Sequence, residues 1–231
     1  MNTVVILQPS YIPWLGYFDQ INKSDNFVFF NDVQYTRRDW RNRNKIKTLD
    51  DQEKYLTIPV NNKGNFFALI KDIQINYQDN WIASHLGIIS DNYRKTPYFQ
   101  EFYPILQKFF SQKFTYLSEL NIEMIKTISD YLGIKHVKFH LSSNLNISPY
   151  KDPTEHLIKI CQNLNASAYL TGDSAQSYLD HEQFKKTNIN LLFHGYKHPE
   201  YKQQGNNFLS HLSIIDLIFN HGPESLKILS A

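Results

Sequence analysis

The sequence has a single cysteine, Cys161, among its 231 residues, so no disulfide can form within the chain. Disulfides accumulate in oxidising compartments, and a chain without them fits a reducing one. A run of about 18 apolar residues, which a membrane-spanning helix needs, is also missing. The apolar run Val4–Leu7 is too short for a signal peptide. We therefore expect a cytoplasmic protein without a membrane span.

An excess of charge of one sign is missing too, because 24 Lys and Arg face 22 Asp and Glu, for a net charge of +2. So small a charge does not indicate nucleic acid as the first choice of partner. Aromatic residues are abundant at 15%, and apolar residues make up 42% of the chain. This composition predicts a globular protein with a real core, and its tyrosines offer both a flat apolar face and a hydroxyl.

Short apolar runs alternate along the chain with segments of helical periodicity, which favours an α/β fold. We expect a mostly parallel, Rossmann-like sheet with helices on both faces, in a single domain over residues 1–231. The region at about 80–132 is helical and could form an inserted subdomain. Strands are expected at Thr3–Gln8, Asn26–Val33, His136–Leu141, Ala168–Thr171 and Asn188–Tyr196, and helices at Leu15–Asn22, Asn80–Tyr93, Tyr98–Phe110, 117–132, from Asp152, and at Leu212–Phe219.

Two further segments, Lys54–Val60 and Leu69–Ile75, alternate between apolar and polar residues. Between them lies Asn61–Asn65, which has the composition of a turn. We expect these two segments to pair with each other as an antiparallel hairpin.

Polar residues follow three of the predicted strands. Gln8 follows the first strand, Asp32 and Gln34 end or follow the second, and Thr171 and Gly172 end a later one. In open α/β sheets, ligands bind outside the carboxyl ends of the strands. We expect these strand ends to form one cleft.

The turn after the first strand carries Gln8, Tyr11 and Trp14. The Gln8 amide and the Tyr11 hydroxyl could orient sugar hydroxyls, and Trp14 could stack on a base or a sugar. Nucleotidyltransferases of the HIGH-motif class carry histidines at this place. The segment Pro13–Gly16 has none, so it predicts a binding turn in preference to a nucleotidyl-transfer motif.

The stretch Gln34–Lys47 is the most basic in the chain, with six cations against Asp39 as its one acid. Guanidinium groups match phosphate oxygens, and an interleaved tryptophan could stack on a ligand. A solvated basic loop or a platform for single-stranded nucleic acid would use the same residue types. If the stretch is extended, alternate residues share a face. The candidate ligand residues in it are Arg38, Trp40, Arg41, Asn42 and Arg43.

Two residues are candidates for a general acid or base, Asp173 and His194. A metal is not expected, because His194 and His198 could share one only on a helix, and Pro199 argues against a helix there. Likewise, His211 and the nearby serine and aspartate at 213 and 216 fall on a packing helix and do not predict a catalytic triad.

The chain as a whole resembles the WbqC-like family of bacterial proteins. The resemblance lies in Gln8–Phe18, in Trp40–Ile46, in Leu170–Gly172 with Tyr178 and Leu179, and in Tyr201–Leu217. It implies a cytoplasmic enzyme of surface-polysaccharide synthesis, such as O-antigen synthesis, that works near nucleotide-linked amino sugars. Such amino sugars are commonly N-acylated, sometimes with amino acids.

Three functions follow as hypotheses. The first is N-acyl or aminoacyl transfer to the amine of a dTDP- or UDP-linked amino sugar, with an acyl or aminoacyl donor as the cofactor. The second is an atypical nucleotidyltransferase or ATP-dependent ligase on a HIGH-type scaffold. The third is a non-catalytic binding protein of the same pathway. The exact reaction and the oligomeric state, which could be a homo-oligomer, stay open.

Overall fold

The fold is seen in a computed structural model that describes residues 1–61 and 67–231. Its centre is a five-stranded sheet with the order β7-β2-β1-β8-β9, in which every neighbouring pair is parallel. This is the α/β sheet that the sequence predicts. The strands of the sheet are β1 (Thr3–Leu7), β2 (Asn26–Phe29), β7 (Lys138–Leu141), β8 (Ala168–Thr171) and β9 (Asn190–Phe193).

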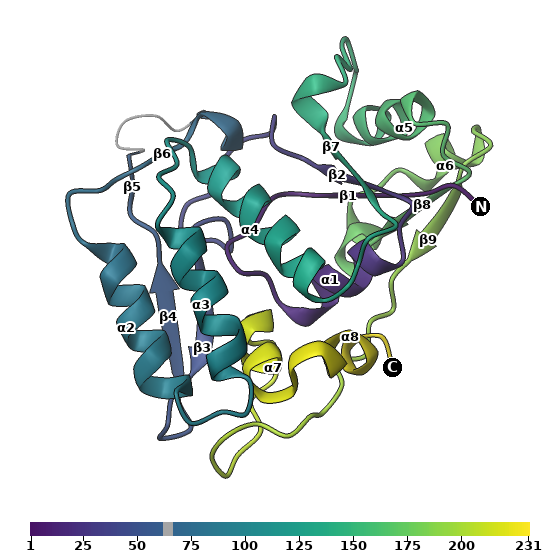
Figure 1. The fold of residues 1–231 in the computed structure, drawn as a ribbon. Helices are drawn as coiled ribbons and strands as arrows, with labels where there is room; N and C mark the ends of the chain where they lie inside the picture. Colours follow the sequence, from purple (N-terminus) through teal and green to yellow (C-terminus); the bar gives the residue numbers. More distant parts are fainter. Residues whose placement is uncertain (62–66) are drawn as a thin grey trace.

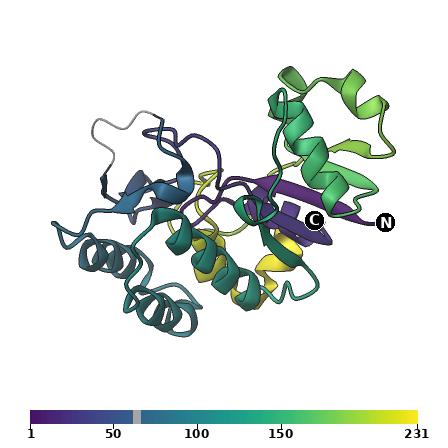
Figure 2. The ribbon, with the colours of Figure 1, turned by 90° about the horizontal axis from the view of Figure 1, so that it is seen from above.

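Helices cover both faces of this sheet, as Figures 1 and 2 show. On one face, α5 and α6 pack against side chains such as Val4, Ile6 and Tyr169. On the other face lie α1, α4, α7 and α8, with α2 and α3 beyond them. The helices are α1 (Leu15–Asn22), α2 (Trp81–Tyr93), α3 (Phe99–Phe110), α4 (Leu117–Tyr131), α5 (Pro153–Asn163), α6 (His181–Lys185), α7 (Ile214–His221) and α8 (Ser225–Leu229).

The centre of the sheet is β1, which pairs with β2 on one side and with β8 on the other. Val4 and Val5 point to opposite faces, and both are fully buried. A strand covered on both faces needs a continuous apolar run, and Val4–Leu7 supplies it.

The predicted antiparallel pairing of Lys54–Val60 with Leu69–Ile75 is confirmed only at one end, where Val60 pairs with Ile75. The strand β4 (Glu53–Thr57) pairs with β3 (Arg43–Lys47), which lies in the basic stretch. The other segment forms a short 3-10 helix (Ile70–Asp72) and then β6 (Gln74–Ile75), which pairs with the short β5 (Val60–Asn61). The turn expected at Asn61–Asn65 lies almost wholly outside the described residues. Alternation within one segment shows which face is buried, and it does not say which strand is the partner.

Two other predicted boundaries change. The second strand ends at Phe29 and not at Val33, because β1, its neighbour in the ladder, ends at Leu7. The residues before β3 in the basic stretch, 37–42, form turns and a bend and not an extended segment, so the expected alternation of faces does not hold there.

The helical region at about 80–132 shares one hydrophobic cluster with the sheet. Phe102 of α3 and Leu120 of α4 belong to the same cluster as Val5 and Phe27. A separately folding subdomain in this region stays a prediction.

Candidate functional site

A cavity of about 720 Å³ lies at the carboxyl ends of β1 and β8. The chain builds the sheet outward from β1 in one direction through β2 and β7, and then crosses to β8 and β9 on the other side. The crevice between β1 and β8 is therefore the topological switch point, where ligands bind in open α/β sheets. The volume suits a ligand of nucleotide size.

Six of the residues that the sequence singles out line this cavity. They come from the turn after β1, from the basic stretch and from the end of β8: Gln8, Trp14, Trp40, Arg41, Thr171 and Gly172. The expected convergence of the first and third strand ends is thus seen in the structure. Several other polar or aromatic residues of the lining were not expected from the sequence: Gln20, Asn44, Tyr178 and His211.

Arg41 is bound at the cavity wall by two partners. Its Nε donates a hydrogen bond of 2.5 Å to Gln8 Oε1, and its Nη1 lies 3.2 Å from Asp39 Oδ2. Burial lowers the pKa of Arg41, and the charge of Asp39 opposes that shift. The guanidinium therefore stands fixed beside the end of β1, where it can face an anion.

Hydrogen bonds from α4 and β3 hold the turn after β1 in place. The buried Asn121 of α4 donates from Nδ2 to the carbonyl oxygens of Pro9 and Arg41, at 3.2 and 2.7 Å. Asn44 of β3 donates to the carbonyl oxygens of Tyr11 and Ile12. This bonding supports Ile12 in the left-handed region at φ 35°, a conformation that β-branched residues rarely adopt.

Trp14 lies just before α1, and its ring covers Gly16. A Cβ on Gly16 would lie 2.4 Å from the indole Cη2, so only glycine fits under the ring. On its other sides the indole contacts Tyr196 edge-on and stacks with His211, whose ring centroid is 5.5 Å away. Trp14 is therefore a fixed wall of the cavity.

Gln20 lies two turns along α1 from Trp14, and it also lines the cavity. Its side chain is 95% buried, since the residue is 5% exposed, and its Oε1 has no hydrogen-bond partner within the described chain. An unpaired buried amide oxygen costs about 1–3 kcal/mol. A ligand that offers an N–H or O–H group to Gln20 would remove this cost.

The cavity mouth is cationic and aromatic on the side of the β3–β4 hairpin. Lys45 lies 2.6 Å from Glu53 across the hairpin. Trp40 is 43% exposed and stacks on Tyr55, and the guanidinium of Arg43 lies over the same tyrosine ring at 5.0 Å. This side can offer a flat surface to a base or a sugar ring.

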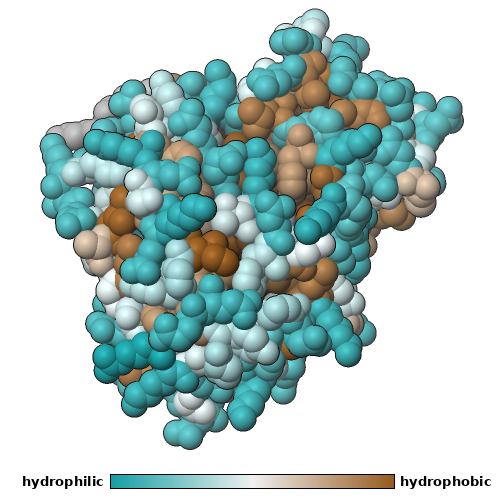
Figure 3. Space-filling view, in the orientation of Figure 1, coloured by the Kyte–Doolittle hydropathy of each residue, from teal (hydrophilic) through white to brown (hydrophobic). Residues whose placement is uncertain are grey.

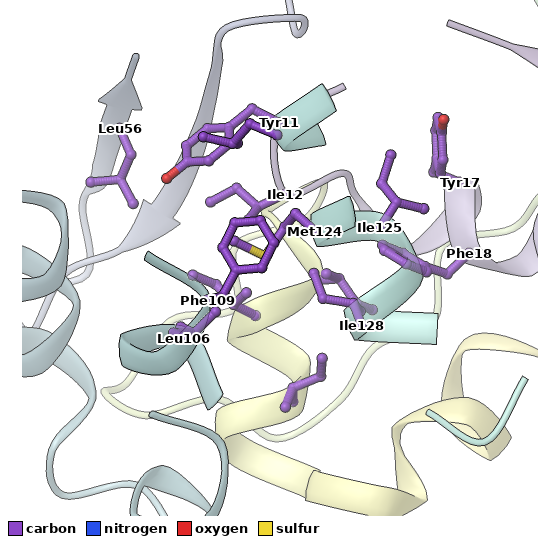
Figure 4. Packing of buried hydrophobic residues seen from close by; sticks show 14 of the residues in the cluster. Tyr11, Ile12, Tyr17, Phe18, Leu56, Leu106, Phe109, Met124, Ile125 and Ile128 are labelled. Atoms are coloured by element: carbon purple, nitrogen blue, oxygen red, sulfur yellow. The ribbon is translucent and has the colours of Figure 1, made fainter. Parts of the chain in front are cut away.

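The other candidate binding residues lie outside the cavity lining. Tyr11 is fully buried, and its hydroxyl forms a 2.9 Å hydrogen bond with His85 Nδ1; Figure 4 shows its ring in the cluster that holds Ile12 and Met124. Asn42 is buried and donates to the Ile58 carbonyl. The rest lie on surface segments: Asp32 accepts from Ser142 Oγ, Gln34 bridges to Leu69, Arg38 is exposed, and Arg43 covers Tyr55.

Asp173 lies just after β8, and His194 lies just after β9, the neighbouring strand. Asp173 is exposed, stands between the cavity-lining Gly172 and Ser174, and accepts a 2.9 Å hydrogen bond from the Gly195 amide. The His194 ring is buried, with Nε2 2.6 Å from Asp19 Oδ2. Burial opposes ionisation of Asp19, but hydrogen bonds from His194 and Lys23 outweigh it and hold the pKa of Asp19 below its usual value.

The described residues hold no group of three or more His, Cys, Asp or Glu side chains placed to bind a metal ion. In the same part of the chain, each helix is too short or too polar to cross a membrane.

A second hollow of about 350 Å³ lies between α4 and β7. It is lined mainly by apolar side chains, among them Phe29, Ile122 and Phe139. Figure 3 shows hydrophobic side chains gathered on this face of the molecule, over β7 and between α4 and α5. It is smaller than the cavity at β1 and β8 and does not lie at the topological switch point, so the cavity at β1 and β8 is the better candidate site.

Comparison with known proteins gives a family and a relative. The model of the WbqC-like protein family matches residues 8–228. A protein of Mycobacterium tuberculosis (strain ATCC 25618 / H37Rv), described as "Uncharacterized protein Rv1507c", is 37% identical over 227 residues, which are 97% of this chain and 96% of the relative. No solved structure matches the chain.

Proposed function

Because the chain belongs to the WbqC-like protein family, we propose that it is an enzyme of bacterial surface-polysaccharide synthesis that acts on a nucleotide-linked amino sugar. The observation that carries this proposal is the cavity at the switch point of the sheet, with Arg41 fixed on Gln8 at the end of β1. Its volume, its aromatic walls and its cations together suit a nucleoside diphosphate sugar better than a small metabolite.

Each group of the ligand has a counterpart among the cavity residues. Arg41 would face the diphosphate, since a guanidinium forms strong charge-assisted bonds to phosphate oxygens. The indole of Trp40 or Trp14 would stack on the base or on the sugar. Gln8 and the unpaired oxygen of Gln20 would bind hydroxyl or amine groups of the sugar.

The proposed reaction is acyl or aminoacyl transfer to the sugar amine. The lone pair of the neutral amine attacks the donor's carbonyl carbon, a new C–N bond forms, and the bond to the leaving group breaks. The nitrogen then loses one proton, which the departing group or a base takes up. Asp173 is the candidate base, because it is exposed beside Gly172 and Ser174 at the cavity edge. His194 stays the second candidate for the base. Its ring is buried, and its Nε2 lies 2.6 Å from Asp19 Oδ2.

Ligand binding tests the substrate class. We expect UDP- or dTDP-amino sugars to raise the Tm of the protein and to bind in isothermal titration calorimetry. Arg41→Met should weaken this binding about tenfold to a hundredfold, which is the loss of one hydrogen bond to a charged group. Arg94→Met, at an exposed residue after α2, is the matched control and should bind as the wild type does. Absence of any stabilisation by these ligands at millimolar concentration would overturn the nucleotide-sugar proposal.

The two alternative functions predict different results with the same protein. An atypical nucleotidyltransferase or ligase would release pyrophosphate from a nucleoside triphosphate in the presence of magnesium and an acceptor. A non-catalytic binding protein would bind the nucleotide sugar but leave the amine unmodified with every acyl donor, and Asp173→Asn would not change glycan modification in cells.

A further inference from the structure

His211 reaches the cavity from the loop before α7, far along the chain from the other walls. Its backbone adopts φ 57°, in the left-handed region that favours glycine. Non-glycine residues held in sparsely populated backbone regions cluster at functional sites. Glycine would adopt this backbone conformation with less strain, but the chain has a histidine here.

The segment around His211 is docked firmly against the turn after β1. Ser213 Oγ donates to the Ile12 carbonyl at 2.7 Å, across 201 residues of sequence. The Ser213 amide donates to the Lys45 carbonyl, and the Ile214 amide donates to the Pro13 carbonyl. The position of His211 at the cavity is thus set by three hydrogen bonds to cavity-forming segments.

His198 fixes His211 from the other side. The His211 amide donates a 3.1 Å hydrogen bond to His198 Nε2, while His198 Nδ1 lies 2.9 Å from the Pro199 carbonyl. A carbonyl can only accept, so Nδ1 carries the proton and Nε2 is free to accept. Burial lowers the pKa of His198, which keeps it in this neutral form.

His211 adds a donor to the cavity wall that is not paired with a carboxylate. Arg41 is paired with Asp39, and Lys45 is paired with Glu53. The His211 ring stacks on Trp14, and its Nδ1 lies 2.9 Å from Ser210 Oγ. If the serine hydroxyl donates to Nδ1, the proton of the ring stays on Nε2, for which the described chain offers no acceptor.

We propose that His211 binds the phosphate-bearing end of the ligand, with Nε2–H donating to a phosphate oxygen. This deepens the proposed function, on which the nucleotide part rests, by assigning the phosphate contact to a residue outside the N-terminal motifs. The left-handed backbone is then the cost of placing an imidazole at this point of the wall.

Three substitutions separate binding from folding. His211→Gly suits the left-handed backbone, so we expect a higher Tm together with an affinity for UDP that is lower by about tenfold or more. His211→Asn also tolerates this backbone but lacks the ring, and should lose affinity as well. His211→Lys supplies an N–H donor in place of the imidazole and should recover most of the affinity. His136→Asn, at an exposed histidine outside the cavity, should bind as the wild type does.

Calorimetry with UDP, a UDP-amino sugar and inorganic pyrophosphate decides the outcome. Loss of affinity in His211→Gly with recovery in His211→Lys supports the proposal. Equal affinity of wild type and His211→Gly for every probe that binds overturns it. Binding of pyrophosphate but of neither nucleotide, with the same dependence on His211, keeps the phosphate site and rejects the nucleotide sugar. No binding of any of the three probes rejects both.

Discussion

The position of Trp14 depends on the absence of a side chain at Gly16. We expect Gly16→Ala to push the indole out of place, because the new Cβ would lie 2.4 Å from Cη2. The variant should lose about 1–3 kcal/mol of unfolding free energy, the usual cost of overpacking, and should bind nucleotide sugars weakly. Urea denaturation and calorimetry measure the two effects.

Gly87 is the matched control for this substitution. It lies exposed within α2, and a Cβ there would contact nothing within 4 Å. Gly87→Ala should stabilise the protein by about 0.5–1 kcal/mol, the gain from replacing glycine in a helix. If both alanines destabilised equally, steric exclusion by Trp14 would not be the cause at position 16.

His85 should make the stability of the protein depend on pH. Burial lowers its pKa from 6.5 to about 4. In the unfolded chain this histidine binds a proton below about pH 6.5, whereas in the folded protein it does so only below about pH 4. Its full contribution to stability is therefore present above pH 6.5 and falls as the pH falls through this window. Between about pH 7 and pH 4.5 the loss from this group is about 2–3 kcal/mol.

The variant His85→Gln, which does not titrate, isolates this effect. Other groups change protonation over the same range, and they do so in both proteins. Denaturation at the two pH values should therefore show a smaller loss in His85→Gln than in the wild type. Equal losses would mean that His85 is not held neutral against Tyr11.

At the scale of elements, α4 joins the two segments that form the front of the site. Asn121→Leu keeps the volume but removes both hydrogen bonds to the carbonyls of Pro9 and Arg41. Leaving these oxygens unpaired should cost about 2–4 kcal/mol and weaken ligand binding, because Arg41 loses its support.

Ser129→Ala on the same helix is the control. Its hydroxyl donates to the Ile125 carbonyl within α4 and does not reach the site. We expect a loss of about 1 kcal/mol or less and unchanged ligand affinity. A binding defect as large as that of Asn121→Leu would show that general loosening of α4 is responsible.

The sequence predicts individual elements better than their partners. The start and end of α1 are local features of the sequence, and so is the start of α5, where the Asp152 carboxylate accepts from the Glu155 amide at 2.9 Å. The pairing of β3 with β4 depends on how the chain folds back, and the basic residues around Arg43 concealed a strand. The buried side chains of β3 are those of Asn44, Ile46 and Lys47, so no apolar pattern predicts this strand.

The same distinction holds for the site. Gln8 and Thr171 could be found because strand ends are visible in the sequence and converge in this class of fold. Gln20 and His211 could not, since one looks like an ordinary helix residue and the other belongs to a distant loop. The left-handed backbone of His211 leaves no trace in residue type.

For the molecule as a whole, a buried polar network around Lys47 joins β3 to the C-terminal region. Lys47 is fully buried, lies 2.9 Å from Asp51, and donates to the Asn207 carbonyl. Close by, Tyr93 and Tyr201 both donate to the buried Asp216 of α7. Lys47→Met should cost about 1–3 kcal/mol, because it removes the bonds of the buried ammonium to Asp51 and to the Asn207 carbonyl, which lie nearer the surface.

Lys185→Met provides the comparison. Its pair with Glu182 is about 70% exposed on both sides, so its loss should leave the stability nearly unchanged. Chemical denaturation of both variants measures the difference. Similar small losses would show that the network around Lys47 is not what ties the C-terminal region to the rest.

The place of β1 in the middle of the sheet has a consequence for the order of events during synthesis. β1 can pair with β2 after some twenty further residues have been made, but its other neighbour, β8, begins only at Ala168. Until then, one edge of an apolar strand stays open to the wrong partner, and such edges invite aggregation. The segment that carries His211 is synthesised later still. A nascent chain can therefore bury most of its core before its binding site is complete.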